Sequence, residues 1–360
     1  MAPLGLFEIV KMNVTLLQIP FFLIYVALFG RRSKRANGRP LGRVLGDETS
    51  YFVLSNLSLR QLQAISGSTL DNYKKWAKKA KIEPVVDDIA QDARLIWIGP
   101  RETENVLIYC HGGGFVGPLS DFQVEFWYRV QQGLRQSKNL KMGVAILQYS
   151  VHPVSFPAQL NQLLAAIQHV SSMGVPMSKI SLAGDSAGAN MLIQLISHIL
   201  HPSSLVSPSP AASTLTGFAG ICLISPWTLP STDTAQQYND SFDLLPFKCL
   251  KEWTDAYLSS IPDSHIPYVQ PDTAPAGWFS GIDKITNRIL ITAGEKELMY
   301  PAIMRFSEML DKSHHSDVQL NVQDNGAHCD PMFDIAAKAT APHLVEKQVT
   351  EWFAETIGAN

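Results

Sequence analysis

One segment of the chain restricts the possible folds more than any other. Residues 179–184 (KISLAG) are a short apolar run, residues 187–200 (AGANMLIQLISHIL) have a helical pattern, and Gly184-Asp185-Ser186-Ala187-Gly188 joins the two. A strand that turns directly into a helix is the βα unit of a parallel sheet. The glycines permit a tight, strained turn that lifts a serine hydroxyl clear of the sheet, at the positive end of the helix. The segment therefore predicts a βα turn that presents Ser186 as a nucleophile.

The same alternation continues on both sides of this segment. Short apolar runs of strand character alternate with longer amphipathic stretches of helical character. The expected strands are 93–99, 105–110, 142–149, 179–184, 218–224, 288–294 and 317–323, and the expected helices are 122–136, 158–172, 187–200 and 342–357. Near-continuous apolar strands between helices indicate a parallel sheet covered on both faces. The fold class is therefore α/β, with a mostly parallel central sheet.

Composition narrows the class of protein. The chain has 360 residues, 46% of them hydrophobic and 17% charged, which suits one large α/β domain and excludes intrinsic disorder. With 29 Lys and Arg against 32 Asp and Glu, the net charge of −3 lacks the basic excess of a nucleic-acid-binding protein. The four cysteines show no CxxC spacing. We therefore expect no metal, no cofactor and no nucleic-acid partner.

The N-terminal region has a different character. Residues 14–30 (VTLLQIPFFLIYVALFG) are uncharged and are followed directly by RRSKR. Such a run matches the thickness of a bilayer core, and a cleaved signal peptide would carry its cations before the apolar run instead. The sequence predicts an N-terminal tail at 1–12, a single-pass transmembrane anchor at 13–30, a basic linker at 31–48 and the main domain at 49–360. Within the main domain, residues 49–90 and 226–280 are expected to form a cap over the carboxyl edge of the sheet.

The membrane face of the main domain is open at this point. The cluster Arg31, Arg32, Lys34 and Arg35 favours a cytoplasmic domain on the endoplasmic reticulum by the positive-inside rule. Two glycosylation sequons, Asn56-Leu-Ser58 and Asn239-Asp-Ser241, would matter only in a lumen.

A second motif follows the expected strand 105–110. His111-Gly112-Gly113-Gly114-Phe115 places three glycines in a row, and bare backbone N–H groups can approach a developing oxyanion that side chains would block. Alone, this run would also suit a phosphate loop or a simple turn. Ahead of the Ser186 turn and after an earlier strand, it fits an oxyanion hole. The candidate donors are Gly112, Gly113 and Gly114, together with Ala187, the residue after the nucleophile.

A serine nucleophile needs a histidine base and an acid that orients it, in the chain order Ser, acid, His. His328 follows the expected strand 317–323, whereas competitors such as His169 and His198 fall on expected helices. Two acids, Glu295 and Glu297, follow the strand 288–294. Residue type and position do not decide which of these two glutamates is the acid that orients His328.

A family resemblance rests on these residues and several others. In order, LIYCHGGGF, LQYSVHPVSFPAQLNQ, SLAGDSAGAN, ISPW and ITAGEKEL resemble the hormone-sensitive-lipase-like branch of the α/β-hydrolases, over roughly residues 90–355. The resemblance implies the α/β-hydrolase fold, a serine ester hydrolase, and Glu297 as the acid beside Ser186 and His328. The anchor, FPAQL and the glutamate after ITAG are similar to fungal membrane-anchored sterol deacetylases. That similarity implies a short-acyl ester of an apolar alcohol, such as a sterol, a terpenoid or another lipid-like metabolite.

Three alternatives remain from the sequence. The same triad would serve an amidase or formamidase, or a lipase for longer acyl chains. A non-catalytic ligand-binding protein can use this fold, as the plant gibberellin receptors do. Those receptors resemble the family with the histidine lost, whereas His328 is present here.

Overall fold

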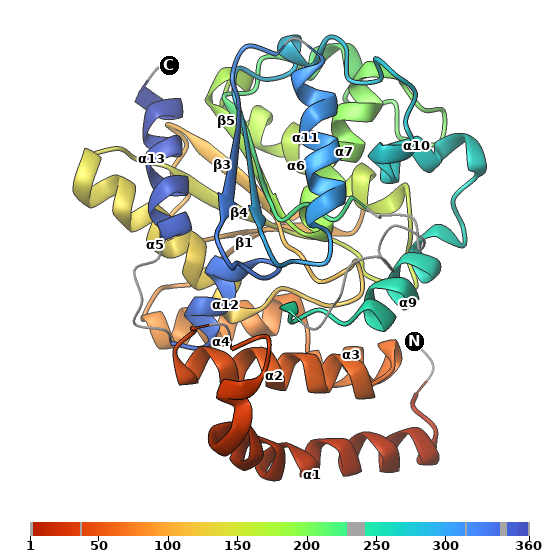
Figure 1. Cartoon of the computed structure of the whole chain (residues 1–360). Helices are drawn as coiled ribbons and strands as arrows, with labels where there is room; N and C mark the ends of the chain where they lie inside the picture. The colour runs from red at the N-terminus through yellow and green to blue at the C-terminus, as the bar shows by residue number, and fades with distance from the viewer. Residues whose placement is uncertain (1–2, 37, 229–241, 314, 339–343, 359–360) are drawn as a thin grey trace.

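The computed structural model describes residues 3–36, 38–228, 242–313, 315–338 and 344–358. Within these ranges, a sheet of eight strands has the order β1-β2-β4-β3-β5-β6-β7-β8 (Figure 1). The pairs β1–β2 and β2–β4 are antiparallel and all the others are parallel, which confirms a mostly parallel sheet. The strands are β1 (Val85–Ile89), β2 (Ala93–Trp97), β3 (Val106–Cys110), β4 (Gly143–Gln148), β5 (Ile180–Asp185), β6 (Gly220–Ile224), β7 (Ile289–Gly294) and β8 (Val318–Gln323).

Helices cover both faces of this sheet, and the strands show why. In β3, Val106, Ile108 and Cys110 pack into one core while Leu107 and Tyr109 pack into the other, so no strand face meets water here. One core is closed by α6 (Ala158–Ser172), α7 (Ala187–Leu200) and α11 (Tyr300–Asp311). The other is closed by α4 (Thr69–Ala80), α5 (Asp121–Lys138) and α13 (Leu344–Gly358).

Strand register brings the functional motifs to one edge. Residues Val106 to Cys110 of β3 pair in parallel with Ile180 to Gly184 of β5. The glycine-rich loop and the serine turn therefore leave the sheet side by side. At the far side, β7 and β8 end together, with Gly294 opposite Gln323. The loops after all four strands consequently meet at the carboxyl edge, where open α/β sheets bind ligands.

Three N-terminal helices lie beneath this edge in Figure 1: α1 (Leu6–Phe29), α2 (Leu41–Asn56) and α3 (Leu59–Ser66). The apolar helix starts at Leu6 rather than at the predicted residue 13. The predicted basic linker 31–48 is wrong in its second half, because α2 begins at Leu41. Arg43 of α2 is buried and binds Asp47 at 2.7 Å, so a cation assigned to a linker is an internal one.

Other elements differ from the sequence prediction. β1 lies within residues 49–90, which were assigned to the cap, but it pairs antiparallel with β2 and forms the edge of the sheet. Two further helices, α11 and α12 (Asp330–Ala336), were not predicted. In the cap region 226–280, the structure contains α9 (Phe247–Leu258) and α10 (Ile266–Val269). Residues 229–241 of that region, including the sequon at Asn239, lie outside the described residues, as does His314.

Candidate active site

The serine turn has the strained geometry that its sequence predicts. Ser186 has a positive φ of 50°, between the end of β5 and the start of α7. Its N–H donates to the carbonyl oxygen of Ile224 at 2.9 Å, and its own carbonyl accepts from the N–H of Trp227 at 3.0 Å. A Cβ at Gly188 would lie 1.9 Å from the carbonyl oxygen of Cys110, so only glycine fits there. These contacts hold an unfavourable backbone conformation in place.

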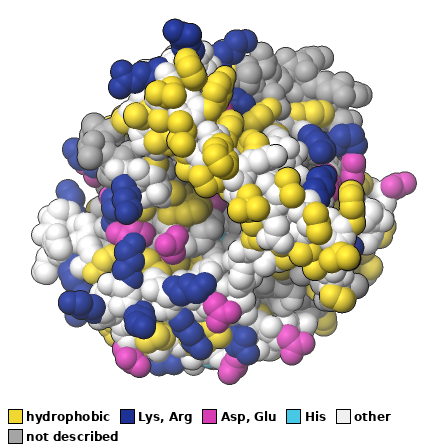
Figure 2. All heavy atoms as spheres, turned by 90° about the horizontal axis from the view of Figure 1, so that it is seen from below, with side chains coloured by type: hydrophobic (Ala, Val, Ile, Leu, Met, Phe, Trp, Pro, Cys, Tyr) yellow, Lys and Arg dark blue, Asp and Glu magenta, His cyan; other side chains and the backbone are white. Residues whose placement is uncertain are grey.

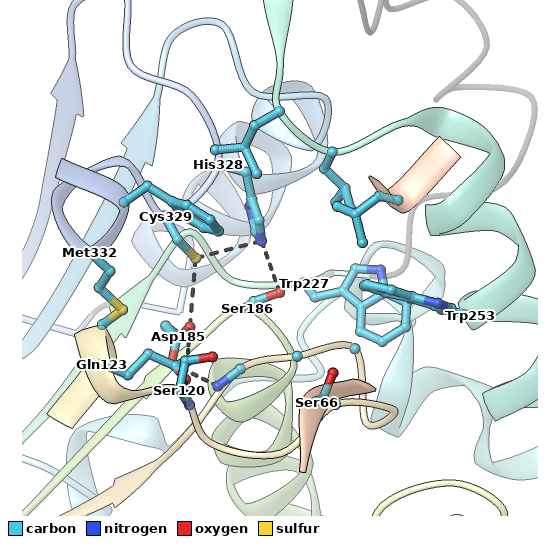
Figure 3. A pocket seen from close by; sticks show the side chains of 18 of the residues that line it. Ser66, Ser120, Gln123, Asp185, Ser186, Trp227, Trp253, His328, Cys329 and Met332 are labelled. Atoms are coloured by element: carbon cyan, nitrogen blue, oxygen red, sulfur yellow. Dashed lines mark hydrogen bonds between the residues drawn. The ribbon is translucent and has the colours of Figure 1, made fainter. Parts of the chain in front are cut away.

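Three predicted residues meet in one hydrogen-bond chain. Nε2 of His328 lies 2.9 Å from Oγ of Ser186, and Nδ1 of His328 lies 2.7 Å from Oε2 of Glu297 (Figure 3 shows the first contact). The other carboxylate oxygen of Glu297 accepts the N–H of Gly294 at 2.8 Å. Because a carboxylate only accepts, Nδ1 of His328 carries the proton and Nε2 presents a lone pair to the serine hydroxyl.

The alternative acid lies elsewhere. The side chain of Glu295 is 41% exposed, and its carboxylate accepts the N–H of Asn325 and pairs with Lys296 at 3.2 Å. Although it is only two residues from Glu297, it makes no hydrogen bond to His328. The geometry therefore selects Glu297, which the residue types alone had left open.

The electrostatics of His328 follow from its surroundings. Burial lowers the pKa of His328, but the hydrogen bond and negative charge of Glu297, with further negative charge from Asp243 and Asp185, raise it more, so the net shift is upward. A histidine beside a buried carboxylate holds a proton more firmly, which suits a group that accepts one during a reaction.

The glycine-rich loop supplies free backbone donors, with one correction to the prediction. Gly113 adopts a φ of 115°, and its carbonyl oxygen accepts the N–H of Gly117 at 2.8 Å, which closes a tight turn. In the described part of the chain, the N–H groups of Gly113, Gly114 and Ala187 have no acceptor. The N–H of Gly112 instead donates to Oδ1 of Asp185 at 2.7 Å. Because that donor is already used, Gly112 is wrong as an oxyanion donor.

Asp185 directly precedes Ser186 in the serine motif, but the sequence analysis assigned it no role. It is buried and accepts hydrogen bonds from the hydroxyl of Tyr109, the N–H of Gly112 and Nε2 of Gln123. Burial raises the pKa of Asp185, and these three donors oppose that shift. The carboxylate thus joins the serine turn to the glycine-rich loop.

Asp243 is a second missed residue, and it comes from the cap region. Its buried carboxylate accepts the N–H of His328 at 3.0 Å and the N–H of Leu298 at 2.8 Å. One side chain therefore ties together the loops that carry the base and the acid. No local motif marks it, because it is 85 positions from His328 in the sequence.

A cavity of about 300 Å³ opens beside Ser186. In Figure 3, Trp227 and Trp253 lie on one side of the serine, and Gln123 and Met332 lie on the other. Helices α2, α3 and α9 contribute further apolar lining residues: Leu54, Leu62 and Leu250. Both regions assigned to the cap therefore reach the cavity. Among the described residues, no group of three or more His, Cys, Asp or Glu side chains could hold a metal ion.

Cys329 lies next to the base. Its Sγ is 3.5 Å from Nε2 of His328 (Figure 3). Burial and the nearby carboxylates hold the pKa of this thiol well above its usual range, so Cys329 stays a neutral thiol. Cys329 lines the cavity but does not compete with Ser186 as a nucleophile, because only the thiolate form is reactive.

Comparison with known proteins identifies the family. Residues 107–331, which include the glycine-rich loop, Ser186, Glu297 and His328, match the model of the alpha/beta hydrolase fold. The chain belongs to the alpha/beta hydrolase family.

Relatives of this hydrolase-fold chain are distant. An acetyl-hydrolase from Streptomyces hygroscopicus is 27% identical over 213 residues, which are 57% of this chain and 61% of that protein. Probable carboxylesterase 13 from Arabidopsis thaliana is 24% identical over 228 residues, 60% of this chain and 67% of that protein. The chain thus matches less than two thirds of the length of the first relative.

Solved structures show the same fold. The Francisella virulence factor BioJ superposes with a TM-score of 0.63 at 17% identity, covering 89% of this chain and 99% of that one. A hormone-sensitive lipase from a metagenome library gives a TM-score of 0.62 at 17% identity, covering 86% of this chain and 97% of that one.

Proposed function

We propose that this protein is a serine carboxylic-ester hydrolase. The observation that carries the proposal is the continuous chain from Oγ of Ser186 through His328 to the buried Glu297, at 2.9 and 2.7 Å. Free N–H groups in the adjoining loop and a cavity beside the serine complete the parts that acyl transfer needs. The names of the two curated relatives, an acetyl-hydrolase and a probable carboxylesterase, support the same reaction class.

The mechanism follows from the positions of these groups. Oγ of Ser186 attacks the ester carbonyl while Nε2 of His328 takes the hydroxyl proton. Glu297 holds the imidazole and stabilises the imidazolium that forms. The N–H groups of Gly113, Gly114 and Ala187 bind the oxyanion, and His328 returns its proton to the leaving alkoxide. Water, deprotonated by His328, then attacks the acyl-enzyme and releases the acid.

The substrate is proposed to be a short-acyl ester of an apolar alcohol, such as an acetylated sterol or terpenoid. A cavity of about 300 Å³ is at the small end for ligand sites, so it offers little room for a long acyl chain. Leu54, Leu62, Trp227 and Trp253 give it apolar walls that suit the alcohol. The similarity to fungal membrane-anchored sterol deacetylases supports the same choice.

We also propose that the protein acts at a membrane, on the endoplasmic reticulum with the main domain facing the cytoplasm. The support is one helix, Leu6–Arg32, that is long and apolar enough to cross a bilayer by length and composition. The exposed cations that follow it suit the anionic lipid surface of a cytoplasmic leaflet.

Hydrolysis of p-nitrophenyl acetate by the full-length chain tests the proposed reaction. Ser186→Ala should lower kcat by about 10⁶, the loss seen on removal of a triad serine, with an unchanged circular dichroism spectrum. Ser66→Ala is the matched control, because Ser66 also lines the cavity but its hydroxyl donates to the carbonyl of Leu62 in its own helix. The control should change kcat by less than about threefold. Equal activity of Ser186→Ala and wild type would refute the mechanism.

A further inference from the structure

The helix α1 is held against the domain at both of its ends. Near its start, Nε2 of Gln61 donates to the carbonyl oxygen of Glu8 at 2.7 Å, and Arg60 pairs with the Glu8 carboxylate at 3.2 Å. Near its end, the rings of Phe22 and Phe52 stack with centroids 4.6 Å apart. Val26 is buried together with residues of α2. The helix therefore lies along the domain and does not project from it (Figure 1).

The opposite side of α1 carries an apolar stripe without a protein partner in the described part of the chain. We call this set the outer stripe; its residues recur every three or four positions, as one helix face requires. Each is between 50% and 79% exposed: Leu6, Val10, Val14, Leu17, Phe21, Ile24 and Leu28. Figure 2 views the molecule from this side and shows apolar side chains gathered there, bordered by Lys and Arg. A continuous apolar surface of this kind marks an interaction site.

Charge indicates what covers the outer stripe. The only acid of α1, Glu8, is turned toward Arg60 and away from the stripe. Lys11 on the helix, and Arg31 and Arg32 directly after it, are exposed. Cations beside an apolar helix face attract the anionic headgroups of a membrane surface. A second copy of this chain would bring the same cations together and would repel.

We propose that α1 lies flat in the interfacial layer of a membrane containing anionic lipid, with the outer stripe in the acyl region, and that it does not cross the bilayer. Length does not decide between the two modes, since 24 residues at about 1.5 Å each would also span a hydrocarbon core. Contacts decide it. Crossing would break the Gln61–Glu8 and Phe22–Phe52 contacts and expose the apolar surface of α2.

The position of α1 also determines the route by which a substrate would reach Ser186; this route rests on the proposed esterase function. Helices α2 and α3 lie directly on α1, and they line the cavity through Leu54, Leu62 and Ser66. An apolar ester dissolved in the lipid layer would therefore approach Ser186 from the side that touches the membrane. Entry from lipid avoids transfer of an apolar alcohol through water.

Flotation with vesicles tests the docking surface on the full-length chain. The protein should float with vesicles of phosphatidylcholine and phosphatidylserine. Leu17→Glu and Phe21→Glu should each weaken binding by about tenfold or more, because each removes an apolar side chain that the membrane would cover. Leu205→Glu is the matched control: this leucine is 42% exposed in a loop away from α1 and should leave binding unchanged. Arg31→Gln with Arg32→Gln should weaken binding only where phosphatidylserine is present. All these variants should keep hydrolysis of a soluble acetate, which separates this result from a failure of the proposed function.

Depth measurement distinguishes a flat helix from a spanning one. The four native cysteines are buried, so a fluorophore can be placed at Leu6→Cys, Leu17→Cys or Leu28→Cys in turn. The proposal predicts equal, shallow depths at all three positions and full quenching by dithionite added outside the vesicle. A deep label at position 17 with a protected label at one end would overturn it in favour of a spanning helix. Failure to bind vesicles, with self-association that the stripe variants abolish, would overturn it in favour of a dimer.

Discussion

The triad and the outer stripe of α1 distribute polar and apolar groups in opposite ways. At the carboxyl edge of the sheet, the ionisable groups are inside: Glu297 is 0% exposed and His328 is 6% exposed. On α1 the apolar groups are outside, with Leu6 at 79% and Phe21 at 75%. Buried polar groups are tolerated where every one has a partner, and exposed apolar groups are tolerated where something other than water covers them. Each region therefore departs from the usual rule for a reason connected to function.

The two regions are joined by one buried cluster of charges. Arg43 of α2 binds Asp47, Asp330 and Asp334 at 2.7, 2.6 and 2.5 Å. Asp330 begins α12, two residues after His328, and its carboxylate also accepts the N–H of Ala327. The loop that carries the base is thus fastened to the same helix that supports α1. We call this Arg43 cluster the junction. Substitutions in the triad should lower the catalytic rate, substitutions in the junction should lower stability, and the cavity wall should limit the length of the acyl chain.

The largest effect is expected inside the triad. Glu297→Gln should lower kcat by about 10⁴, since the amide cannot stabilise the imidazolium and favours the wrong tautomer. Glu295→Gln is the matched control, two residues away and bound to Asn325 and Lys296 instead of His328, and should leave kcat within about threefold of wild type. Steady-state kinetics with p-nitrophenyl acetate measures both variants. The reverse ranking would move the acid to Glu295.

The junction should respond in stability. Arg43→Met removes the ion pair of Asp334 and leaves Asp47 and Asp330 paired with Arg39 alone. It should lower the free energy of unfolding by about 3 kcal/mol, the lower end of the loss on breaking a buried ion pair, measured by denaturant titration in detergent. Arg60→Met removes an ion pair whose arginine is 43% exposed and should cost less than about 1 kcal/mol. If both variants unfold at the same denaturant concentration as wild type, the N-terminal helices are not fastened to the histidine loop.

The cavity wall, to which both regions contribute, should limit acyl length. We expect kcat/KM to be highest for acetyl to butyryl esters and to fall by about tenfold or more beyond about eight carbons, because each methylene that does not fit gains nothing and displaces a wall residue. A series of p-nitrophenyl esters measures this. Rates that rise steadily to palmitoyl would identify a lipase for long chains.

The smallest effect is a shift in pH dependence. Because the pKa of His328 lies above its ordinary value of about 6.5, and the neutral imidazole is the active form, activity should fall as pH drops through that raised pKa. Asp243→Asn removes a negative charge near the ring and should move the midpoint of kcat/KM to lower pH. Its lost hydrogen bond should also lower kcat by about tenfold. A fall in kcat with an unmoved midpoint would assign Asp243 a purely structural role.

Local patterns in the sequence predict much of this molecule. The strand–turn–helix around Ser186 and the apolar strands of the parallel sheet depend on neighbours in the chain, so periodicity and glycine spacing reveal them. β1 was missed because its sequence, VVDDI, has two acids, and one of them, Asp87, accepts a hydrogen bond from the Trp97 indole of the paired strand β2. Both Glu295 and Glu297 lie in the turn after β7, and only the side chain of Glu297 points to His328. Residue type does not reveal that difference in direction.

The sequence did not predict the polar contacts between residues that are far apart in the chain. Asp243, Asp185 and Arg43 each bind groups far away in the sequence, and a lone acid or arginine has the same appearance on a surface as in a cluster. The start of α1 at Leu6 was missed for a related reason. Glu8 and Lys11 lie in the predicted N-terminal tail, whereas in the structure both belong to α1: Glu8 pairs with Arg60, and Lys11 lies beside the outer stripe.

The central claim is that Ser186 is the nucleophile of a triad with His328 and Glu297. The most direct test is to treat the full-length chain with a fluorophosphonate and locate the adduct by peptide mass spectrometry. We predict one stoichiometric adduct on Ser186, at a rate that falls by about 10³ or more in His328→Ala. An enzyme that hydrolyses acetate esters yet carries the adduct on another residue, or none at all, would contradict the account.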